Sequence, residues 1–179
     1  RKKTPAVLLK LDISRAFDNV SWEYLLELMV KLGFSARWRD WITILLATSS
    51  SAFLLNGVPG QTIMHQCGLR QGDPLSPLLF ILAIDPIHRL LKASEEELHI
   101  TPVLGREIKF RVSLYADDAV IFANPIREEI DYLMDLLESF GDATGLKINN
   151  AKSTATPFRC NDIGLITVLQ SLGGPIMQF

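Results

Sequence analysis

The sequence has few cysteines, no long hydrophobic run and no excess of one charge. Its two cysteines, Cys67 and Cys160, are too few and too far apart for a disulfide framework, and no Cys-x-x-Cys pair indicates structural zinc. The longest strongly apolar run, Pro77 to Pro86, is much shorter than the roughly 20 residues that cross a bilayer. The sequence therefore favours a reducing compartment and carries no signal for membrane insertion or secretion.

The charge balance argues against a freestanding nucleic-acid-binding protein. The formal net charge is -2 and the pI is about 5.9, whereas neutralising phosphates normally requires a basic face. Two explanations stay open: a basic surface lies partly in another part of a longer protein, or acidic groups concentrate around a metal site. Composition does not separate them.

The chain suits one globular domain covering residues 1–179. It has 179 residues, 48% of them hydrophobic, enough for a substantial core but not for a second one. No internal repeat or low-complexity stretch divides it. It starts with Arg1 rather than Met and ends on the apolar run from Gly174 to Phe179. We therefore expect it to be a fragment of a longer chain.

The first part of the chain predicts a strand, two helices and a hairpin. Ala6 to Ile13 is a nearly unbroken apolar run, typical of a strand buried on both faces, although periodicity does not exclude a short helix. Ser21 and Ser35 each precede apolar residues at helical spacing, and Gly33 can end the first helix. The second helix would place Trp38, Trp41, Ile42, Leu45 and Leu46 on its apolar face. A turn from Gly57 to Gly60 then joins two β-prone segments, Ser51 to Asn56 and Gln61 to Gln66.

The second part predicts a helix, another hairpin and a last helix. Ser76 and Pro77 would cap and begin a helix that is apolar all round and packs inside the core. The β-prone runs Phe110 to Tyr115 and Ala119 to Ala123 flank an acidic pair at the hairpin tip. A helix then follows Pro125, with an apolar stripe of Ile126, Ile130, Leu133, Met134, Leu137 and Phe140, and ends at Gly141 or Gly145. This order predicts an α+β domain with helices backing a largely antiparallel sheet.

Three carboxylates have unusual surroundings. Asp12 ends a hydrophobic strand, and Asp117 and Asp118 lie within the apolar hairpin YADDAVIF. Asp is disfavoured in strands and costly to bury unpaired, and a hard divalent cation with oxygen ligands would remove that cost. The alternative is that the pair forms an ordinary exposed turn while Asp12 caps the following segment. The residues alone leave both open.

Four motifs follow one another over nearly the whole chain. They are KLDISRAFDNVSW from Lys10 to Trp22, GLRQGDPLSPLLF from Gly68 to Phe80, YADDAVIF from Tyr115 to Phe122 and GLKINNAKS from Gly145 to Ser153. In this order they closely resemble the reverse transcriptases of non-LTR retrotransposons, particularly the plant LINE type. The resemblance implies a polymerase palm, with a small, largely antiparallel sheet backed by helices, that lacks most of the fingers and thumb.

The resemblance also implies a metal site. Asp12, Asp117 and Asp118 match the family's catalytic carboxylates, and the backbone carbonyl of Ile13 matches a further ligand. The implied cofactors are two Mg²⁺ ions, with Mn²⁺ as an alternative. One ion would activate the primer 3′-hydroxyl and the other would steady the triphosphate and the departing pyrophosphate.

Four more residues match family positions near the nucleotide. Phe17 matches the aromatic that excludes a ribose 2′-hydroxyl; without the resemblance, a core aromatic is the more common role. Gln71 and Gly72 match the loop beside the incoming nucleotide and template, and otherwise read as a plain loop. Lys152 matches a lysine of the block after the catalytic hairpin, a region in which a polymerase lysine can act as a catalytic acid that protonates the leaving pyrophosphate, although a solvated surface position is more usual.

The implied enzyme is an RNA-directed DNA polymerase, a nucleotidyltransferase that moves a nucleotide from a dNTP to a primer 3′-hydroxyl. Its partners would be an RNA template, a DNA primer, dNTPs, and the fingers, thumb and endonuclease regions of a parent polyprotein, with no membrane. The expected location is intracellular, in the nucleus with assembly in the cytoplasm. The alternative is an inactive retroelement remnant that acts at most as a binding or structural domain, and we expect the fragment alone to be inactive.

Overall fold

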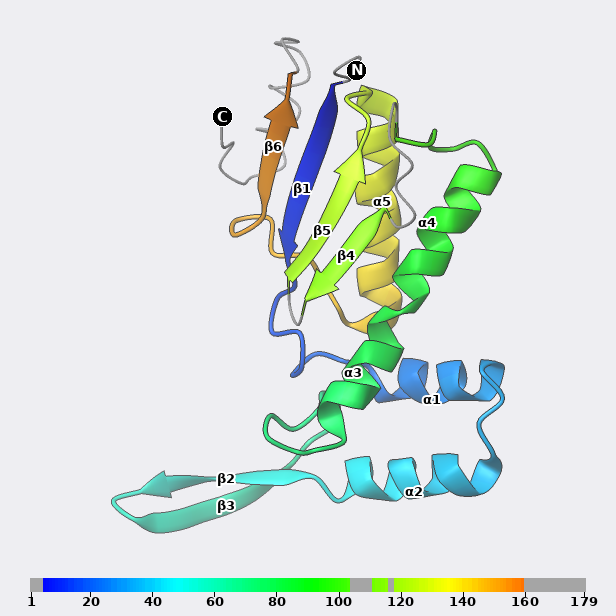
Figure 1. Ribbon diagram of the computed structural model, residues 1–179. Helices are drawn as coiled ribbons and strands as arrows, with labels where there is room; N and C mark the ends of the chain where they lie inside the picture. The colour runs from blue at the N-terminus through cyan, green and yellow to red at the C-terminus, as the bar shows by residue number, and fades with distance from the viewer. Residues whose placement is uncertain (1–4, 104–110, 116–117, 160–179) are drawn as a thin grey trace. The chain divides into compact units, whose positions relative to one another are not determined.

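The computed structural model describes residues 5–103, 111–115 and 118–159 (Figure 1). Its helices and strands run in the order β1 (Ala6–Asp12), α1 (Trp22–Lys31), α2 (Ala36–Ala47), β2 (Ser50–Leu55), β3 (Val58–Met64), α3 (Ser76–Ile84), α4 (Pro86–Glu96), β4 (Val112–Tyr115), β5 (Asp118–Ala123), α5 (Arg127–Thr144) and β6 (Thr154–Phe158). They form two compact units. The assignment of residues 1–179 to one palm domain stays a prediction.

The first unit is built on a four-stranded sheet in the order β4-β5-β1-β6. All three strand pairs are antiparallel, and β1 lies between β5 and β6. Along β1 and β5 the register runs from Val7 opposite Ala123 to Asp12 opposite Asp118. The predicted neighbourhood of the first strand and the acidic hairpin is therefore confirmed, as is the α+β class.

Strand β1 buries one face rather than the two that its apolar run predicts. Val7, Leu9 and Leu11 are buried, whereas Lys10 between them is exposed. Successive side chains in a strand point to opposite faces, so the apolar residues at alternate positions form the core face. Helix α5 covers one face of the sheet (Figure 1), and its buried apolar side chains are Ile130, Leu133, Leu137 and Phe140.

Two elements of the first unit were not predicted from the sequence. Helix α4 begins at Pro86, directly after α3, and has Ile87 and Leu91 on its buried face. In the sequence Pro86 marks the end of an apolar run, but proline is also well suited to a first helical turn, and Pro86 begins α4. Strand β6 is short and contains Pro157, and it becomes a strand by pairing with β1.

The predicted last helix is present, and its two proposed ends can now be compared. Helix α5 continues through Gly141 to Thr144. Gly145 follows it with a φ of +83°, the left-handed conformation that commonly ends a helix. Gly145 is therefore the residue that terminates the helix.

The second unit contains α1, α2, the β2–β3 hairpin and α3. Ser21 caps α1 as predicted, and Ser35 caps α2, the helix predicted to follow it, since their side chains accept from the backbone N–H groups of Tyr24 and Trp38. Helix α1 packs against α2 and α3. On α2 only Ile42 and Leu46 are buried, so the wider apolar face predicted for this helix is wrong: Trp38, Trp41 and Leu45 are exposed.

The predicted four-residue loop of the first hairpin is also wrong. Leu55 pairs with Val58, and only Asn56 and Gly57 lie between the strands. Both have positive φ, 50° and 80°, the geometry of a tight hairpin turn for which Asn-Gly is the preferred pair. The predicted turn from Gly57 to Gly60 contains Pro59, which instead lies in β3 beside an irregularity in the register.

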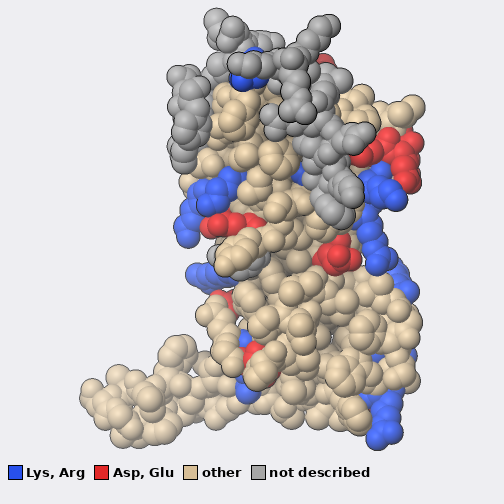
Figure 2. All heavy atoms as spheres, viewed as in Figure 1, with Lys and Arg blue, Asp and Glu red and all other residues tan. Residues whose placement is uncertain are grey.

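The β2–β3 hairpin is apolar and exposed. Its exposed apolar side chains are Phe53, Leu54, Leu55, Val58, Ile63 and Met64. No charged residue occurs between Asp40 and Arg70, and Figure 2 shows the hairpin without Lys, Arg, Asp or Glu on its visible face. No helix of the described residues is long and apolar enough to cross a membrane.

Helix α3 is only partly inside the core. Leu79, Phe80 and Ala83 are buried, but Leu78 and Ile81 are exposed, so the prediction of a helix buried all round is wrong. Ser76 is the first helical residue rather than the cap. The carboxylate of Asp73 accepts from the N–H of Leu75 at 2.8 Å and stabilises this end of the helix instead.

A buried polar cluster joins the segments beside α5. The carboxylate of Glu129 accepts from both the N–H and the hydroxyl of Thr101, at 3.1 and 2.6 Å, and from the amide of Asn124 at 3.2 Å. The Nε of Arg111 lies 2.9 Å from the carboxylate of Glu95. Burial lowers the pKa of Arg111, and the charges of Glu95 and Glu129 oppose that shift. The Thr101 and Asn124 donors of the cluster thus have a carboxylate acceptor, which stabilises this arrangement.

Replacing Glu129 tests this cluster. Glu129→Ala removes a buried carboxylate that accepts three hydrogen bonds, and we expect the free energy of unfolding to fall by about 1.5–3 kcal/mol, because hydrogen bonds to a charged group are lost. Glu128→Ala is the matched control, since Glu128 is exposed and should change stability by less than about 0.5 kcal/mol. Urea denaturation measures both. Equal, small effects would show that the cluster does not stabilise the fold.

Candidate functional site

Asp12 and Asp118 lie opposite each other at the ends of neighbouring strands. Asp12 is the last residue of β1, Asp118 is the first of β5, and the two are Cα partners in the antiparallel register. Directly opposed side chains lie on the same face of a sheet, with Cβ atoms about 4.5–5.5 Å apart. Both residues are half-buried. Two of the three predicted carboxylates are therefore brought together.

The third predicted carboxylate, Asp117, lies outside the described residues. So does the expected meeting of Asp12 with Asp117. Among residues 5–103, 111–115 and 118–159, no group of three or more His, Cys, Asp or Glu side chains could hold a metal ion. The described part of the site is a pair of carboxylates from adjacent strands.

The backbone of Asp12 is held on both sides by the fourth sequence motif. Its N–H donates to the hydroxyl of Ser153 at 3.1 Å, and its carbonyl accepts from the N–H of Asn149 at 2.8 Å. The Ser153 hydroxyl in turn donates to the carbonyl of Asn149 at 2.8 Å. These bonds form a closed clamp that fixes the backbone of Asp12 where β1 ends.

Neither Ser153 nor Asn149 was predicted from the sequence as a site residue. Both lie in the motif that carries Lys152, where small polar residues are less distinctive than the charged lysine. The available signal in the sequence is a serine next to a predicted catalytic lysine, at the end of the fourth motif. The contact itself depends on β6 pairing with β1, which the sequence did not predict.

Two predicted site residues are sequence neighbours of the clamp: Ile13 follows Asp12, and Lys152 precedes Ser153. Ile13 is buried and forms an isolated bridge with Ile148. Lys152 is exposed, and its backbone N–H donates to the carbonyl of Asn149 at 3.1 Å. It is the neighbour of Ser153, which contacts Asp12. The metal-ligand role of the Ile13 carbonyl and the catalytic role of Lys152 stay predictions.

Phe17 and the Gly68–Gln71 loop lie in the second unit. The ring of Phe17 is stacked on that of Phe80, with centroids 4.6 Å apart and planes 19° from parallel. The carbonyl of Phe17 accepts from the N–H of Leu69 at 2.6 Å. Phe17 is half-buried as a residue, and its ring packs against that of Phe80. The structure thus joins the end of the first motif to the start of the second.

Gly68 is required at this junction. Its φ is +81°, and a Cβ at this position would lie 2.3 Å from the carbonyl oxygen of Asp18. Its N–H donates to the carbonyl of Val20 at 2.8 Å, and its own carbonyl accepts from the indole of Trp22 at 2.6 Å. Any other residue would push the loop away from residues 17–22.

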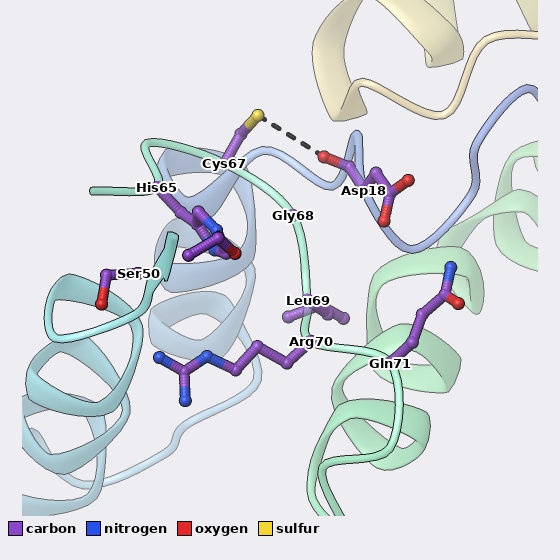
Figure 3. Close-up of a pocket in the computed structure, with 9 residues that line it drawn as sticks. Asp18, Ser50, His65, Cys67, Gly68, Leu69, Arg70 and Gln71 are labelled. Carbon is purple, nitrogen blue, oxygen red and sulfur yellow. Dashed lines mark hydrogen bonds between the residues drawn. The ribbon is translucent and has the colours of Figure 1, made fainter. Parts of the chain in front are cut away.

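A cavity of about 630 Å³ lies beside this loop (Figure 3). Its polar lining includes Arg70 and Gln71, and the hairpin contributes Ser51 and His65, whose hydroxyl and Nε2 are 2.7 Å apart. Within the described ranges, no carboxylate lies within 4.0 Å of the Arg70 guanidinium in an ion pair. Gly72 follows with a φ of +90°. A positively charged group therefore lines a polar cavity next to the predicted nucleotide loop.

Comparison with known proteins points to one family. The family model described as "Reverse transcriptase (RNA-dependent DNA polymerase)" matches residues 1–166. The Pol polyprotein of the type-2 retrotransposable element R2DM from Drosophila melanogaster is 29% identical over 164 residues, which cover 92% of this chain and 15% of that protein. The transposon TX1 149 kDa protein of Xenopus laevis is 28% identical, over 82% of this chain and 11% of that protein. The predicted resemblance to non-LTR retrotransposons is confirmed, whereas the plant LINE type stays a prediction.

Solved structures show a related fold. Telomerase from Candida tropicalis, in complex with a TWJ fragment of telomeric RNA, has a TM-score of 0.67 at 10% identity, covering 89% of this chain and 27% of that one. Telomerase from Candida albicans has a TM-score of 0.62 at 14% identity, covering 83% and 27%. The likeness confirms the predicted polymerase palm class. The chain spans only a small part of these relatives.

The Asp12 clamp can be tested without activity. Ser153→Ala removes an acceptor for the Asp12 N–H and a donor to Asn149, and we expect the free energy of unfolding to fall by about 1–2 kcal/mol. Amide hydrogen exchange at Asp12 should become faster. Ser113→Ala is the control, because Ser113 is exposed on β4 of the same sheet. Unchanged exchange at Asp12 would argue against the clamp.

Proposed function

The chain belongs to the reverse transcriptase family, and on this premise we propose that it is the palm segment of an RNA-directed DNA polymerase. The reaction is transfer of a nucleotide from a dNTP to a primer 3′-hydroxyl on an RNA template. The observation that carries the proposal is the register that sets Asp12 opposite Asp118 at the end of the central strands. Paired carboxylates from adjacent strands suit two-metal phosphoryl transfer.

The residues present fit a divalent cation in chemistry. Asp12 and Asp118 offer carboxylate oxygens on one face of the sheet, which are the ligands that Mg²⁺ and Mn²⁺ prefer. Placing two such charges opposite each other is unfavourable without a cation between them. Asp117 and the carbonyl of Ile13 would complete the set. When bound, two divalent ions would supply the charge that activates the primer hydroxyl and neutralises the pyrophosphate.

The protein residues contribute positioning and charge. The clamp from Ser153 and Asn149 holds Asp12 at a constant place, which limits the reorganisation needed when substrates bind. Lys152, next to that clamp, would donate a proton to the leaving pyrophosphate. The contribution of each group depends on holding the reacting atoms within a fraction of an ångström.

The second unit would bind the nucleotide and template. The ring of Phe17, a half-buried residue, would lie under the sugar and exclude a 2′-hydroxyl. Gln71 and Gly72 would contact the incoming nucleotide and the template. Arg70, on the wall of the same cavity, would pair with a phosphate. These polar and cationic groups support nucleic-acid substrates despite the acidic overall charge.

The remaining partners belong to the parent polyprotein. Fingers and thumb would provide most of the basic surface that grips the template, primer and triphosphate. An intracellular location, with action in the nucleus after assembly in the cytoplasm, suits such an enzyme. The competing function is an inactive remnant that binds without catalysis, and activity separates the two.

Primer extension tests the enzyme directly. A longer polypeptide that restores fingers and thumb should copy an RNA template with labelled dNTPs and Mg²⁺. Residues 1–179 alone should not, because bound metal ions accelerate the reaction little when primer, template and triphosphate are not held in place. In the longer polypeptide, Asp12→Asn and Asp117→Asn should each lower synthesis by about a thousandfold or more, since each removes a ligand charge with little change in volume.

Asp131→Asn is the control for these variants. Asp131 lies on α5 in an exposed pair with Arg127, so its activity should match the wild type. Full activity of Asp117→Asn would contradict the two-metal mechanism. A folded, soluble longer polypeptide without synthesis would support the remnant instead.

Sugar selection at Phe17 is a separate prediction. Phe17→Val should reduce the preference for dNTPs over rNTPs by about ten- to a hundredfold, because a smaller side chain leaves room for the 2′-hydroxyl. The preference is the ratio of kcat/KM values for the two nucleotides. Phe80→Leu is the control for lost packing, since it removes the stacking partner but keeps the Phe17 side chain itself, so it should keep more of the preference than Phe17→Val does. If both variants keep the preference, Phe17 acts only in packing.

A further inference from the structure

A lysine lies among the carboxylates of the candidate metal site. The Nζ of Lys10 is 3.3 Å from the Oδ2 of Asp118, and the side chains are 52% and 41% exposed. In the register, Lys10 is opposite Val120 and Asp12 is opposite Asp118. Lys10 on β1 therefore contacts the residue diagonally opposite it on the neighbouring strand β5. Long side chains can span this diagonal distance.

The sheet geometry puts this ammonium on the face of the carboxylates. Lys10 and Asp12 are two residues apart in β1, so their side chains point the same way, opposite to buried Leu9 and Leu11. Asp118 joins them from β5. Within the described ranges, Asp118 has a cationic partner, whereas no Lys, Arg or His nitrogen lies within 4.0 Å of the Asp12 carboxylate in an ion pair.

The charges on this face work against one another. Two opposed carboxylates repel, and a cation beside one of them offsets that repulsion when no metal is present. The same ammonium is unfavourable for a divalent cation arriving at the site, because it repels that cation and occupies an oxygen that would be a ligand. The pair is partly exposed, so water and salt reduce both effects without removing them.

We propose that Lys10 is a positioning residue that holds the Asp118 carboxylate in the metal-free protein and competes with the divalent cation for it. The proposal rests on the proposed function, because it assumes that Asp12 and Asp118 take part in binding the cation. Lysine suits such a role: its ammonium is a single, hydrated charge on a flexible stem, and it can leave the carboxylate without breaking a bidentate contact. The metal would thus have to displace the Lys10 ammonium, which already neutralises part of the carboxylate charge at the site.

Metal affinity tests the proposal without any polymerase activity. The probe is Mn²⁺, titrated into the 179-residue chain and followed by the electron paramagnetic resonance signal of the free ion. Lys10→Met keeps most of the apolar stem and removes the charge, and we expect it to bind Mn²⁺ about two- to fivefold more tightly than the wild type, the range for a partly exposed ion pair. Lys10→Arg keeps the charge and can hold Asp118 with two hydrogen bonds, so its affinity should equal or fall below that of the wild type.

Thermal unfolding provides a second readout. Without metal, Lys10→Met should have a lower Tm than the wild type, because the carboxylates lose their cation. Adding Mn²⁺ should raise its Tm by more than it raises that of the wild type, since ligand binding to the folded state stabilises it in proportion to affinity. A structural role alone would lower the Tm without changing Mn²⁺ affinity. Lys92→Met is the control, because Lys92 forms an exposed pair with Glu96 on α4 and should change neither affinity nor the Mn²⁺ effect.

The outcomes distinguish this inference from the proposed function. If Lys10→Met and the wild type bind Mn²⁺ equally while Asp12→Asn loses binding, the competition by Lys10 is wrong and the metal site stands. If Asp12→Asn binds Mn²⁺ as the wild type does, or if the wild type binds none, the metal site itself is wrong and the inference fails with it. Circular dichroism of each variant, matched to the wild type, shows that a change in affinity is not caused by unfolding.

Discussion

The antiparallel pairing of β1 with β5 is the interaction on which the candidate site depends. The register opposes Asp12 and Asp118 and at the same time places Leu9 and Leu11 on the buried face. A shift by one residue would turn the carboxylates into the core and the leucines outward. Burial of the apolar residues therefore fixes the face on which the carboxylates lie, so the stability of the core and the orientation of the site have the same origin.

Hydrogen bonds from the fourth motif add a second constraint. Ser153 and Asn149 hold the N–H and the carbonyl of Asp12, so the strand end that carries the carboxylate cannot fray. Strand ends are usually the less stable part of a sheet, and a catalytic group placed there needs such support. In the second unit, the glycine at position 68 lets the loop lie against residues 17–22. Each motif is thus held by close backbone contacts as well as by its own side chains.

Much of the fold could be predicted from local patterns. The cap at Ser21 and the helix that follows Ser35 are correctly predicted, and Gly145 is one of the two predicted ends of α5, because these effects depend on the adjacent turn alone. The Asn56-Gly57 turn follows from the same local reasoning. The prediction instead gave a four-residue turn, because Pro59 also favours a turn. Strand β6 was missed for another reason: a short threonine-rich segment becomes a strand only when a partner such as β1 is beside it.

The sequence by itself determined which residues could carry chemistry and the family they resemble, since the acidic positions and the four motifs are visible as an order of residue types. It also determined the α+β class, because the periodicity of apolar residues follows from the local backbone. Only the tertiary structure decided that Asp12 is opposite Asp118, that Ser153 holds Asp12, and that Lys10 contacts Asp118. These contacts join residues up to 141 positions apart. Their formation depends on strand register and chain reversal, which no local pattern specifies.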